Sequence, residues 1–122
     1  MNFILIAVCV TLGSVGQILF KVGVNAANTK GIATAPIIQK ILTYLVAPQV
    51  LLGLLCYSVA TVLWIYLLSR VPVSWAYPFL GLTYVAVLFL SAIILGEKIT
   101  TLHFVATAII WFGVFMLVRV PV

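Results

Sequence analysis

Long runs of apolar residues without a charged side chain fill most of this chain. Four runs hold no Lys, Arg, Asp or Glu, and they cover residues 1–20, 41–69, 71–96 and 99–118. An α-helix rises about 1.5 Å per residue, so roughly 20 apolar residues cross the hydrocarbon core of a bilayer, which is about 30 Å thick. Each run is therefore long enough to span a membrane as a helix.

Polar and turn-forming residues separate these runs and set the ends of the expected helices. Asn and Gly residues follow the first run, a proline stands in the link between the second and the third, and a Gly-Glu-Lys turn precedes the fourth. The pattern predicts membrane-spanning helices at about residues 3–22, 48–69, 74–95 and 101–118, with a short interfacial helix at about 36–44. We therefore expect one all-α membrane domain covering residues 1–122.

The composition agrees with lipid as the solvent of this chain. Hydrophobic residues make up 66% of its 122 residues, and a soluble domain of this size could not hide them. The net charge of +5 comes from a few scattered cations, whereas nucleic-acid binding needs a basic face. No soluble catalytic domain fits between the spans. The first run lacks the basic start of a cleaved signal peptide, so we expect it to remain as a helix.

Two cysteines, Cys9 and Cys56, fall inside expected spans. Single cysteines at such positions are usually small apolar packing residues, and these two lack the spacing of metal ligands. We expect no disulfide, no metal and no cofactor.

The first span carries a stripe of polar residues. At 3.6 residues per turn, Ser14, Gln17 and Lys21 lie within about 60° of one another, flanked by Gly13 and Gly16. Polar side chains are costly inside a bilayer and usually face a protein interior or a wet cavity. One interpretation is a helix–helix hydrogen bond from Gln17 beside a lysine that reaches the interface. The other is a polar track that leads to a cation and suits an anionic group.

The third span repeats this pattern with tyrosines. Tyr77, Gly81 and Tyr84 follow an i, i+4, i+7 spacing, in which Gly81 would form a notch between two phenol rings. Tyrosines near a membrane surface can simply belong to an aromatic belt, but Tyr84 lies too deep for one, which favours a cavity lining. Pro78 frees a carbonyl one turn earlier, so Pro78 and Gly81 are expected to permit bending.

The second and fourth spans offer smaller polar sets. Tyr57, Thr61 and Trp64 share one face of the second span. The fourth span offers His103 and Thr107 at i, i+4, and Thr100 or Thr101 would cap its start. His103 is more typical of a structural hydrogen-bonding residue than of a proton carrier.

Glu97 is the only acidic residue of the chain, and it falls in the turn before the fourth span. A proton-driven exporter of cationic drugs needs a carboxylate deep within a span, which binds the proton and the drug in turn. The sequence has no such residue, which argues against a cation/proton antiporter. Glu97 would either anchor its turn through an ion pair or meet an amine on the cargo.

The junction between the second and third spans carries a recognisable motif. Trp64 is followed after five residues by Arg-Val-Pro-Val, then by Ala-Tyr-Pro and Leu80, and a Gly-Glu pair and a histidine come later. This order resembles the small four-span members of the drug/metabolite transporter superfamily, which share a fold with small multidrug resistance and EamA-type transporters. The resemblance covers nearly the whole chain except the connection around residues 25–45.

Within that superfamily, the chain most resembles the aminoarabinose-phosphoundecaprenol flippase subunits. Those proteins show a Gly-Gln-x3-Lys run, which ends here at Lys21, and a Val-Pro-Val-x2-Ala-Tyr-Pro run, which ends here at Pro78. They also show a Glu-x5-His spacing, which ends here at His103. The motif at the helix junction is fairly specific, and the run in the first helix is less so.

The resemblance implies a lipid flippase and not an enzyme. Its substrate would be a polyprenyl-phosphate-linked sugar, such as undecaprenyl phosphate with an aminoarabinose-like pentose, crossing the bacterial inner membrane during lipopolysaccharide modification. Four helices enclose too little space for a sugar-phosphate, so the expected partner is a similar four-helix subunit in a homodimer or heterodimer. Membrane lipids, and no nucleic acid, complete the expected partners.

The same resemblance gives the polar residues their expected roles. Lys21 would pair with the phosphate and reduce the cost of moving an anion through a medium of low dielectric constant. Arg70 would receive the phosphate at the opposite face, and Glu97 would hold two helices or meet the sugar amine. Four residues would replace the hydrogen bonds that the headgroup loses with water: Ser14, Gln17, Tyr77 and Tyr84.

The chain departs from one related family at a key position, and two other functions remain as alternatives to a flippase. Small multidrug resistance proteins carry an essential glutamate in the first helix where this chain has Gly13, so drug/proton exchange is not implied. The alternatives are an exporter of small cationic or neutral metabolites from the same superfamily, and a non-transporting subunit that scaffolds a lipid-modifying enzyme.

Overall fold

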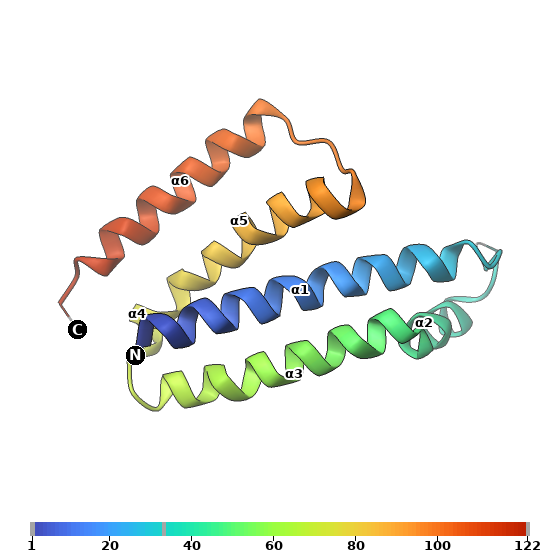
Figure 1. Ribbon diagram of the computed structural model, residues 1–122, viewed down its shortest axis with the longest axis horizontal. Helices are drawn as coiled ribbons and strands as arrows, with labels where there is room; N and C mark the ends of the chain where they lie inside the picture. Colours follow the sequence, from blue (N-terminus) through green and yellow to red (C-terminus); the bar gives the residue numbers. More distant parts are fainter. Residues whose placement is uncertain (1, 33, 122) are drawn as a thin grey trace.

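The computed structural model describes residues 2–32 and 34–121 and is built of helices joined by short connections (Figure 1). In chain order these are α1 (Asn2–Asn28), α2 (Ile37–Val46), α3 (Pro48–Leu68), α4 (Val73–Ala76), the 3-10 helix η1 (Tyr77–Leu80), α5 (Gly81–Leu90), the π-helix η2 (Ser91–Leu95) and α6 (Thr101–Val118). Among the described residues, α1, α3, the continuous segment Val73–Leu95 and α6 are long and apolar enough to cross a membrane. The predicted all-α membrane fold is confirmed.

The expected helix ends agree with the structure except at the end of the first span. α6 has the predicted bounds, whereas α1 continues six residues past the expected end and takes in part of the predicted loop. Two contacts account for the extension: Ala27 is buried with 2% exposure, and the Tyr44 hydroxyl donates a 2.8 Å hydrogen bond to Oδ1 of Asn28. The single-domain prediction includes residues 1, 33 and 122, which lie outside the described part, and it stays a prediction.

α1 and α3 pack backbone against backbone through glycines. A Cβ on Gly16 would lie 3.1 Å from the carbonyl oxygen of Gly53, and a Cβ on Gly53 would lie 2.9 Å from the carbonyl oxygen of Gly16. Two turns further along α1, a Cβ on Gly23 would lie 2.5 Å from Cγ2 of Val50. Small residues of this kind let two membrane helices approach closely, and van der Waals packing then holds them together.

The third span changes its helix type along its length. Pro78 falls in the 3-10 helix η1 between α4 and α5, where proline cannot supply the backbone N–H that an α-helix requires. The span ends in the π-helix η2, whose last turn closes at Gly96 with φ +67. The backbone N–H of Glu97 donates to the carbonyl oxygen of Ser91 over 3.3 Å. The span is therefore irregular at both ends.

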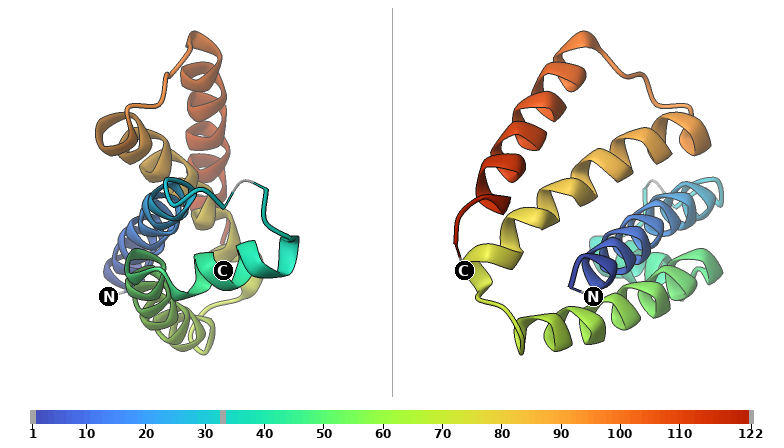
Figure 2. Two further views of the ribbon diagram at one scale, coloured as in Figure 1. Left: turned by 90° about the vertical axis from the view of Figure 1, so that its right-hand side faces the viewer. Right: turned by 60° about the vertical axis from the view of Figure 1, so that its left-hand side comes forward.

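α6 contacts α5 and η1 and diverges from the other spans along its length (Figures 1 and 2). Its start is capped by Thr100, whose backbone N–H donates a 3.1 Å hydrogen bond to Nδ1 of His103. His103 therefore makes a structural hydrogen bond of the kind that its place at the helix start predicts. Of the two threonines predicted to cap the helix, Thr100 is the N-cap and Thr101 is the first helical residue.

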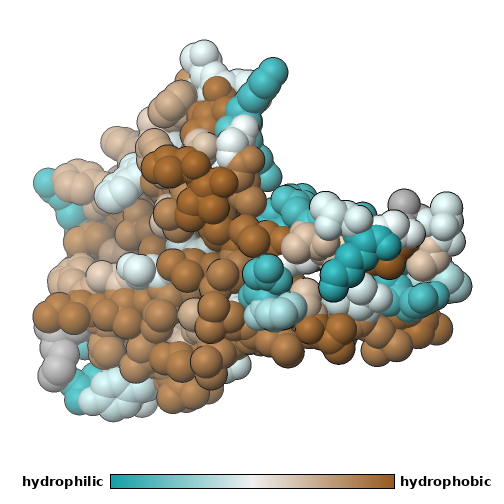
Figure 3. All heavy atoms as spheres, turned by 45° about the vertical axis from the view of Figure 1, so that its right-hand side comes forward, coloured by the Kyte–Doolittle hydropathy of each residue, from teal (hydrophilic) through white to brown (hydrophobic). Residues whose placement is uncertain are grey.

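Both ends of the chain lie at the end of the molecule that carries the α3–α4 link, as four antiparallel spans require (Figure 1). A small core at that end joins Ile6, Leu67, Ala76, Phe79 and Val114. α2 crosses the other end and contacts α1 and α3 (Figure 2). Apolar side chains cover the flanks of the helices, which is the surface that lipid tails would meet (Figure 3).

Candidate functional site

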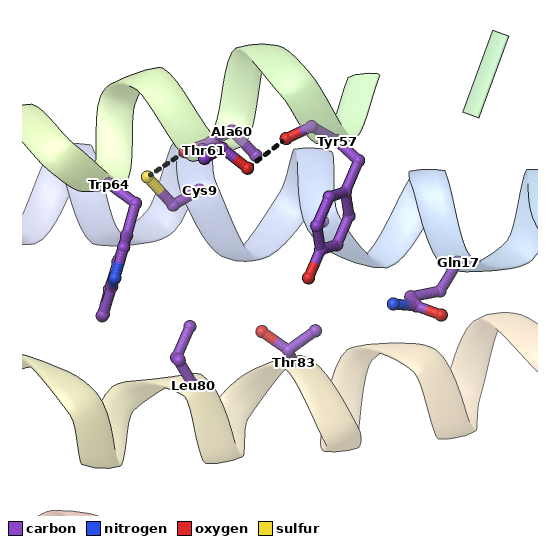
Figure 4. A pocket seen from close by; sticks show the side chains of 9 residues that line it. Cys9, Gln17, Tyr57, Ala60, Thr61, Trp64, Leu80 and Thr83 are labelled. Carbon is purple, nitrogen blue, oxygen red and sulfur yellow. Dashed lines mark hydrogen bonds between the residues drawn. The ribbon is translucent and has the colours of Figure 1, made fainter. Parts of the chain in front are cut away.

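A cavity of about 300 Å³ lies between α1, α3 and the third span. α1 contacts both α3 and α5, so it forms the floor of the cavity while the other two form its walls (Figure 4). The lining residues are Cys9, Gly13 and Gln17 of α1; Tyr57, Ala60, Thr61 and Trp64 of α3; Leu80 of η1; and Thr83 of α5.

The cavity lies near the middle of the expected bilayer. Gly13, at its floor, is about 17 Å along α1 from Asn2, and the hydrocarbon core is about 30 Å thick. The cavity is also open at its side, because Gln17, Tyr57 and Thr61 line it and are all exposed. It is therefore a cleft in the flank of the bundle.

The cleft offers hydrogen-bonding groups that are not used within the protein. In the described part of the chain, the amide of Gln17, the phenol of Tyr57, the indole of Trp64 and the hydroxyl of Thr83 make no side-chain hydrogen bond to another protein group. Such groups at this depth are costly unless water or a ligand satisfies them.

Thr83 differs in this respect from Ser14, Ser58 and Thr61, three other hydroxyl residues of the spans. The hydroxyls of Ser14, Ser58 and Thr61 each donate to the carbonyl four residues earlier, over 2.6, 2.7 and 2.9 Å respectively. This local bond removes the need for an outside partner. Thr83 makes no such bond among the described residues, and Figure 4 shows its side chain in the space between α5 and α1. Its hydroxyl is free to bind a ligand.

Gly13 creates much of the space in the cleft. It is buried, yet a Cβ added there would meet no heavy atom within 4 Å. A larger side chain at this position would therefore enter the cleft without striking a neighbouring helix.

The predicted polar stripe of α1 is divided by the structure. Gln17 lines the cleft, whereas Ser14 is only 1% exposed and its hydroxyl bonds to the Val10 carbonyl. Lys21 is exposed and does not line the cleft, but it continues the row of Gly13 and Gln17 at the same four-residue spacing. It therefore lies about 6 Å beyond Gln17 along the helix axis.

The predicted tyrosine face of the third span does not line the cleft. Tyr77 and Tyr84 are 62% and 45% exposed, and a Cβ on Gly81 would lie 3.1 Å from Cγ2 of Ile110 on α6. The expected notch between two phenols is thus filled by α6. Thr83, two residues after Gly81, lies about 200° around the helix and faces the cleft instead.

Four residues that line the cleft were not among the site residues predicted from the sequence: Tyr57, Thr61, Trp64 and Thr83. The shared face of Tyr57, Thr61 and Trp64 was visible in the sequence, and the structure turns it toward the cleft. Thr83 gave little signal, because a lone threonine in an apolar helix usually bonds to its own backbone.

The two remaining charged candidates lie away from the cleft. The Arg70 guanidinium stacks 4.7 Å above the ring of Tyr66 and also donates to the hydroxyl of that tyrosine. Glu97 is exposed in the connection between η2 and α6. Neither residue is among those that line the cleft.

Comparison with known proteins identifies the family. The profile of the EamA-like transporter family matches residues 4–119, nearly the whole chain. This chain belongs to the EamA-like transporter family.

Individual relatives agree with this assignment. The chain is 32% identical over 117 residues to the "Probable 4-amino-4-deoxy-L-arabinose-phosphoundecaprenol flippase subunit ArnE" of Enterobacter sp. (strain 638), with 96% of each protein covered. Proteins of the same name from Yersinia pestis (strain Pestoides F) and Yersinia pseudotuberculosis serotype O:3 (strain YPIII) are 38% identical over 55 residues. There the alignment covers 45% of this chain and 48% of the relative. No solved structure matches.

The family and the four apolar spans together make this EamA-like chain a multi-pass membrane protein of a transporter family. The resemblance inferred from the sequence motifs is confirmed by the family match and by the relatives named as flippase subunits.

Proposed function

We propose that this EamA-like protein is a flippase subunit that moves a polyprenyl-phosphate-linked sugar across the bacterial inner membrane. The observation that supports it most is the cleft itself, which places uncommitted hydrogen-bonding groups at mid-depth and opens at the side of the bundle. The cargo named for the ArnE relatives, 4-amino-4-deoxy-L-arabinose-phosphoundecaprenol, supplies the first candidate substrate.

A side opening suits a substrate that is part lipid and part polar headgroup. The polyprenyl tail can remain among the lipid tails while the headgroup enters the cleft between α3 and α5. The free groups of Gln17, Tyr57 and Thr83 then replace the hydrogen bonds that the headgroup loses with water. An enclosed pocket would force the tail to leave the bilayer.

Lys21 is proposed to hold the phosphate. It lies one helical turn beyond Gln17 in the same row, so a headgroup in the cleft would place its phosphate toward this amine. Pairing an anion with an ammonium offsets part of the free energy that the anion loses when it leaves water. Arg70, at the end of α3, and Glu97, beside α6, are proposed to act at the two membrane surfaces.

A second four-helix subunit is proposed to close the open side of the cleft. One chain supplies a floor and two walls, and transporters built from repeated units commonly bind substrate between those units. Ser14, Tyr77 and Tyr84 do not line the cleft of the single chain. The two exposed tyrosines would join the site if the partner or a movement of α6 brings them to it.

Reconstitution of the full chain, with any subunit that copurifies, tests this proposal. Vesicles would carry a glycosylated undecaprenyl phosphate, and the measurement would be the fraction of its headgroups that reach the opposite leaflet over time. We expect Gln17→Ala and Lys21→Ala each to slow the movement at least about tenfold, because each leaves part of the headgroup unpaired. Gly13→Leu should slow it by narrowing the cleft.

Ser58→Ala is the matched control, since Ser58 is exposed on α3 and its hydroxyl bonds to the Leu54 carbonyl. It should leave the rate unchanged. Movement at the wild-type rate in both Gln17→Ala and Lys21→Ala would contradict the proposed site. Failure of the unaltered protein to move any glycosylated polyprenyl phosphate would contradict the function.

A further inference from the structure

We propose that the cleft is the binding site for the sugar ring of the cargo and that it selects sugars without a positive charge. This inference rests on the proposed flippase function and names its substrate class more narrowly. It departs from the aminosugar in the names of the relatives, because the residues of this chain's own cleft point to a neutral headgroup.

The shape and surface of the cleft suit one sugar ring. Its volume of about 300 Å³ is at the small end of ligand pockets, which range over about 300–1,000 Å³. Trp64 and Tyr57 project from the same wall toward the opposite span (Figure 4). Such rings offer a flat apolar surface with a polar edge, so they can meet both the C–H face and the hydroxyls of a sugar.

The hydrogen-bonding groups opposite these rings complete a site for hydroxyls. Gln17 offers an amide that both donates and accepts, and Thr83 offers a hydroxyl that does the same. These two groups come from different helices and flank the space in front of Tyr57 (Figure 4). A sugar hydroxyl, which also donates and accepts, matches them without any charge.

The proposed preference for neutral sugars follows from the charges around the cleft. None of its nine lining residues is Asp or Glu, and the single carboxylate of the chain, Glu97, lies fourteen residues beyond Thr83. The helical part of this separation, from Thr83 to Leu95, is about 18 Å long, and Glu97 lies beyond the end of the span. An ammonium group held by these nine residues would lose part of its water without gaining a carboxylate partner from this chain, and an ion that leaves water unpaired loses free energy.

A neutral sugar avoids this cost. Its hydroxyls exchange water for the free groups of Gln17, Tyr57 and Thr83, an exchange that is close to neutral in free energy. The cleft should therefore pass a polyprenyl phosphate with a neutral pentose or hexose faster than the same lipid with an aminopentose.

Gly13 is a position at which a negative charge can be added to the cleft, so the effect of charge on selectivity can be tested. Because a Cβ there meets nothing within 4 Å, Gly13→Glu should place a carboxylate in the cleft without disturbing the helices. Gly13→Gln is its uncharged control of nearly the same size. Both variants and the unaltered protein would be reconstituted with any copurifying subunit and given two lipids, undecaprenyl phosphate carrying either arabinose or 4-amino-4-deoxyarabinose.

We expect the unaltered protein to move the arabinose lipid at least about tenfold faster than the aminoarabinose lipid. Gly13→Glu should raise the rate for the amino lipid relative to the neutral one by a similar factor, increasingly as rising pH ionises the new carboxylate. Gly13→Gln should slow both lipids alike and leave their ratio unchanged.

The outcomes separate the two proposals. Equal or faster movement of the aminoarabinose lipid by the unaltered protein would overturn the selectivity and leave the flippase function standing. If Gly13→Glu and Gly13→Gln change the ratio of the two lipids' rates by the same factor, the role of charge in the cleft is overturned. Absence of movement for both lipids in the unaltered protein would overturn the flippase function itself.

Discussion

The α1–α3 pair and the pair formed by the third span and α6 are held together in different ways. Between α1 and α3, Gly16 and Gly53 bring carbonyl oxygens within about 3 Å of the positions that Cβ atoms would take. Between α5 and α6, Gly81 faces the side chain of Ile110, and much of the surface of α6 remains exposed. One pair is fixed by its backbone, whereas the other touches through side chains that can rotate.

This difference shows which wall of the cleft can move. α1 and α3 supply the floor and one wall, and their contact cannot loosen without losing the packing of two backbones. The opposite wall belongs to the third span, whose 3-10 and π-helical segments depart from the regular α-helical bonding pattern. We therefore expect the cleft to widen and narrow by movement of the third span and α6 against a fixed α1–α3 unit.

Of three glycine substitutions in these two helix pairs, at Gly53, Gly113 and Gly81, Gly53→Ala should destabilise the protein most. The new Cβ would lie 2.9 Å from the Gly16 carbonyl oxygen and close to the ring of Phe20, so the two helices must separate. Overpacking of this kind costs about 1–3 kcal/mol, which exceeds the gain in helix propensity. The measurement is the free energy of unfolding in mixed detergent micelles.

Gly113→Ala provides the control for Gly53→Ala, because a Cβ at Gly113 of α6 meets nothing within 4 Å. It should leave the protein unchanged or stabilise it by up to about 1 kcal/mol. Equal destabilisation by the two substitutions would show that α6 is packed as tightly as α3.

Thr100→Ala should have a smaller effect that is confined to α6. The Thr100 hydroxyl lies 2.8 Å from Nδ1 of His103, and loss of a helix N-cap costs about 1 kcal/mol. Because α6 has few contacts with the rest of the bundle, we expect this loss to appear as faster amide hydrogen exchange in the first turns of α6. Exchange in α1 should stay the same, and faster exchange throughout the bundle would contradict the independence of α6.

Gly81→Ala should have the smallest effect. The added Cβ would lie 3.1 Å from Cγ2 of Ile110, a side-chain atom that can shift, so the strain and the gain in helix propensity should nearly cancel. We expect a change in unfolding free energy within about 0.5 kcal/mol, measured as for Gly53→Ala. A loss as large as that of Gly53→Ala would mean that α6 is held rigidly against α5.

Local patterns in the sequence were sufficient to predict the four spans and a threonine cap at the start of α6. Length and apolar composition gave four helices, with the bounds of α6 as predicted, because a bilayer accepts only segments that satisfy their own backbone groups. A threonine cap at Thr100 or Thr101 could also be predicted, whereas the structure adds that His103, within the same turn, is the partner of Thr100. The end of α1 could not, because it depends on contacts with Tyr44 and on the burial of Ala27.

The lining of the cleft was decided by tertiary structure. The sequence placed polar residues on helix faces, but it could not state which face meets which neighbour. Gly81 turned out to face α6, Ser14 lies inside the bundle, and Thr83 lines the cleft although nothing in its local sequence distinguishes it.

The sequence by itself determined that this chain spans a membrane four times, lacks a carboxylate within its spans and carries the motifs of its transporter family. These properties depend on composition and on residues close together in the chain. Only the tertiary structure decided that Gln17, Tyr57, Trp64 and Thr83 share one cleft. Helix rotation is set by close packing at Gly16 and Gly53, and periodicity alone does not specify it.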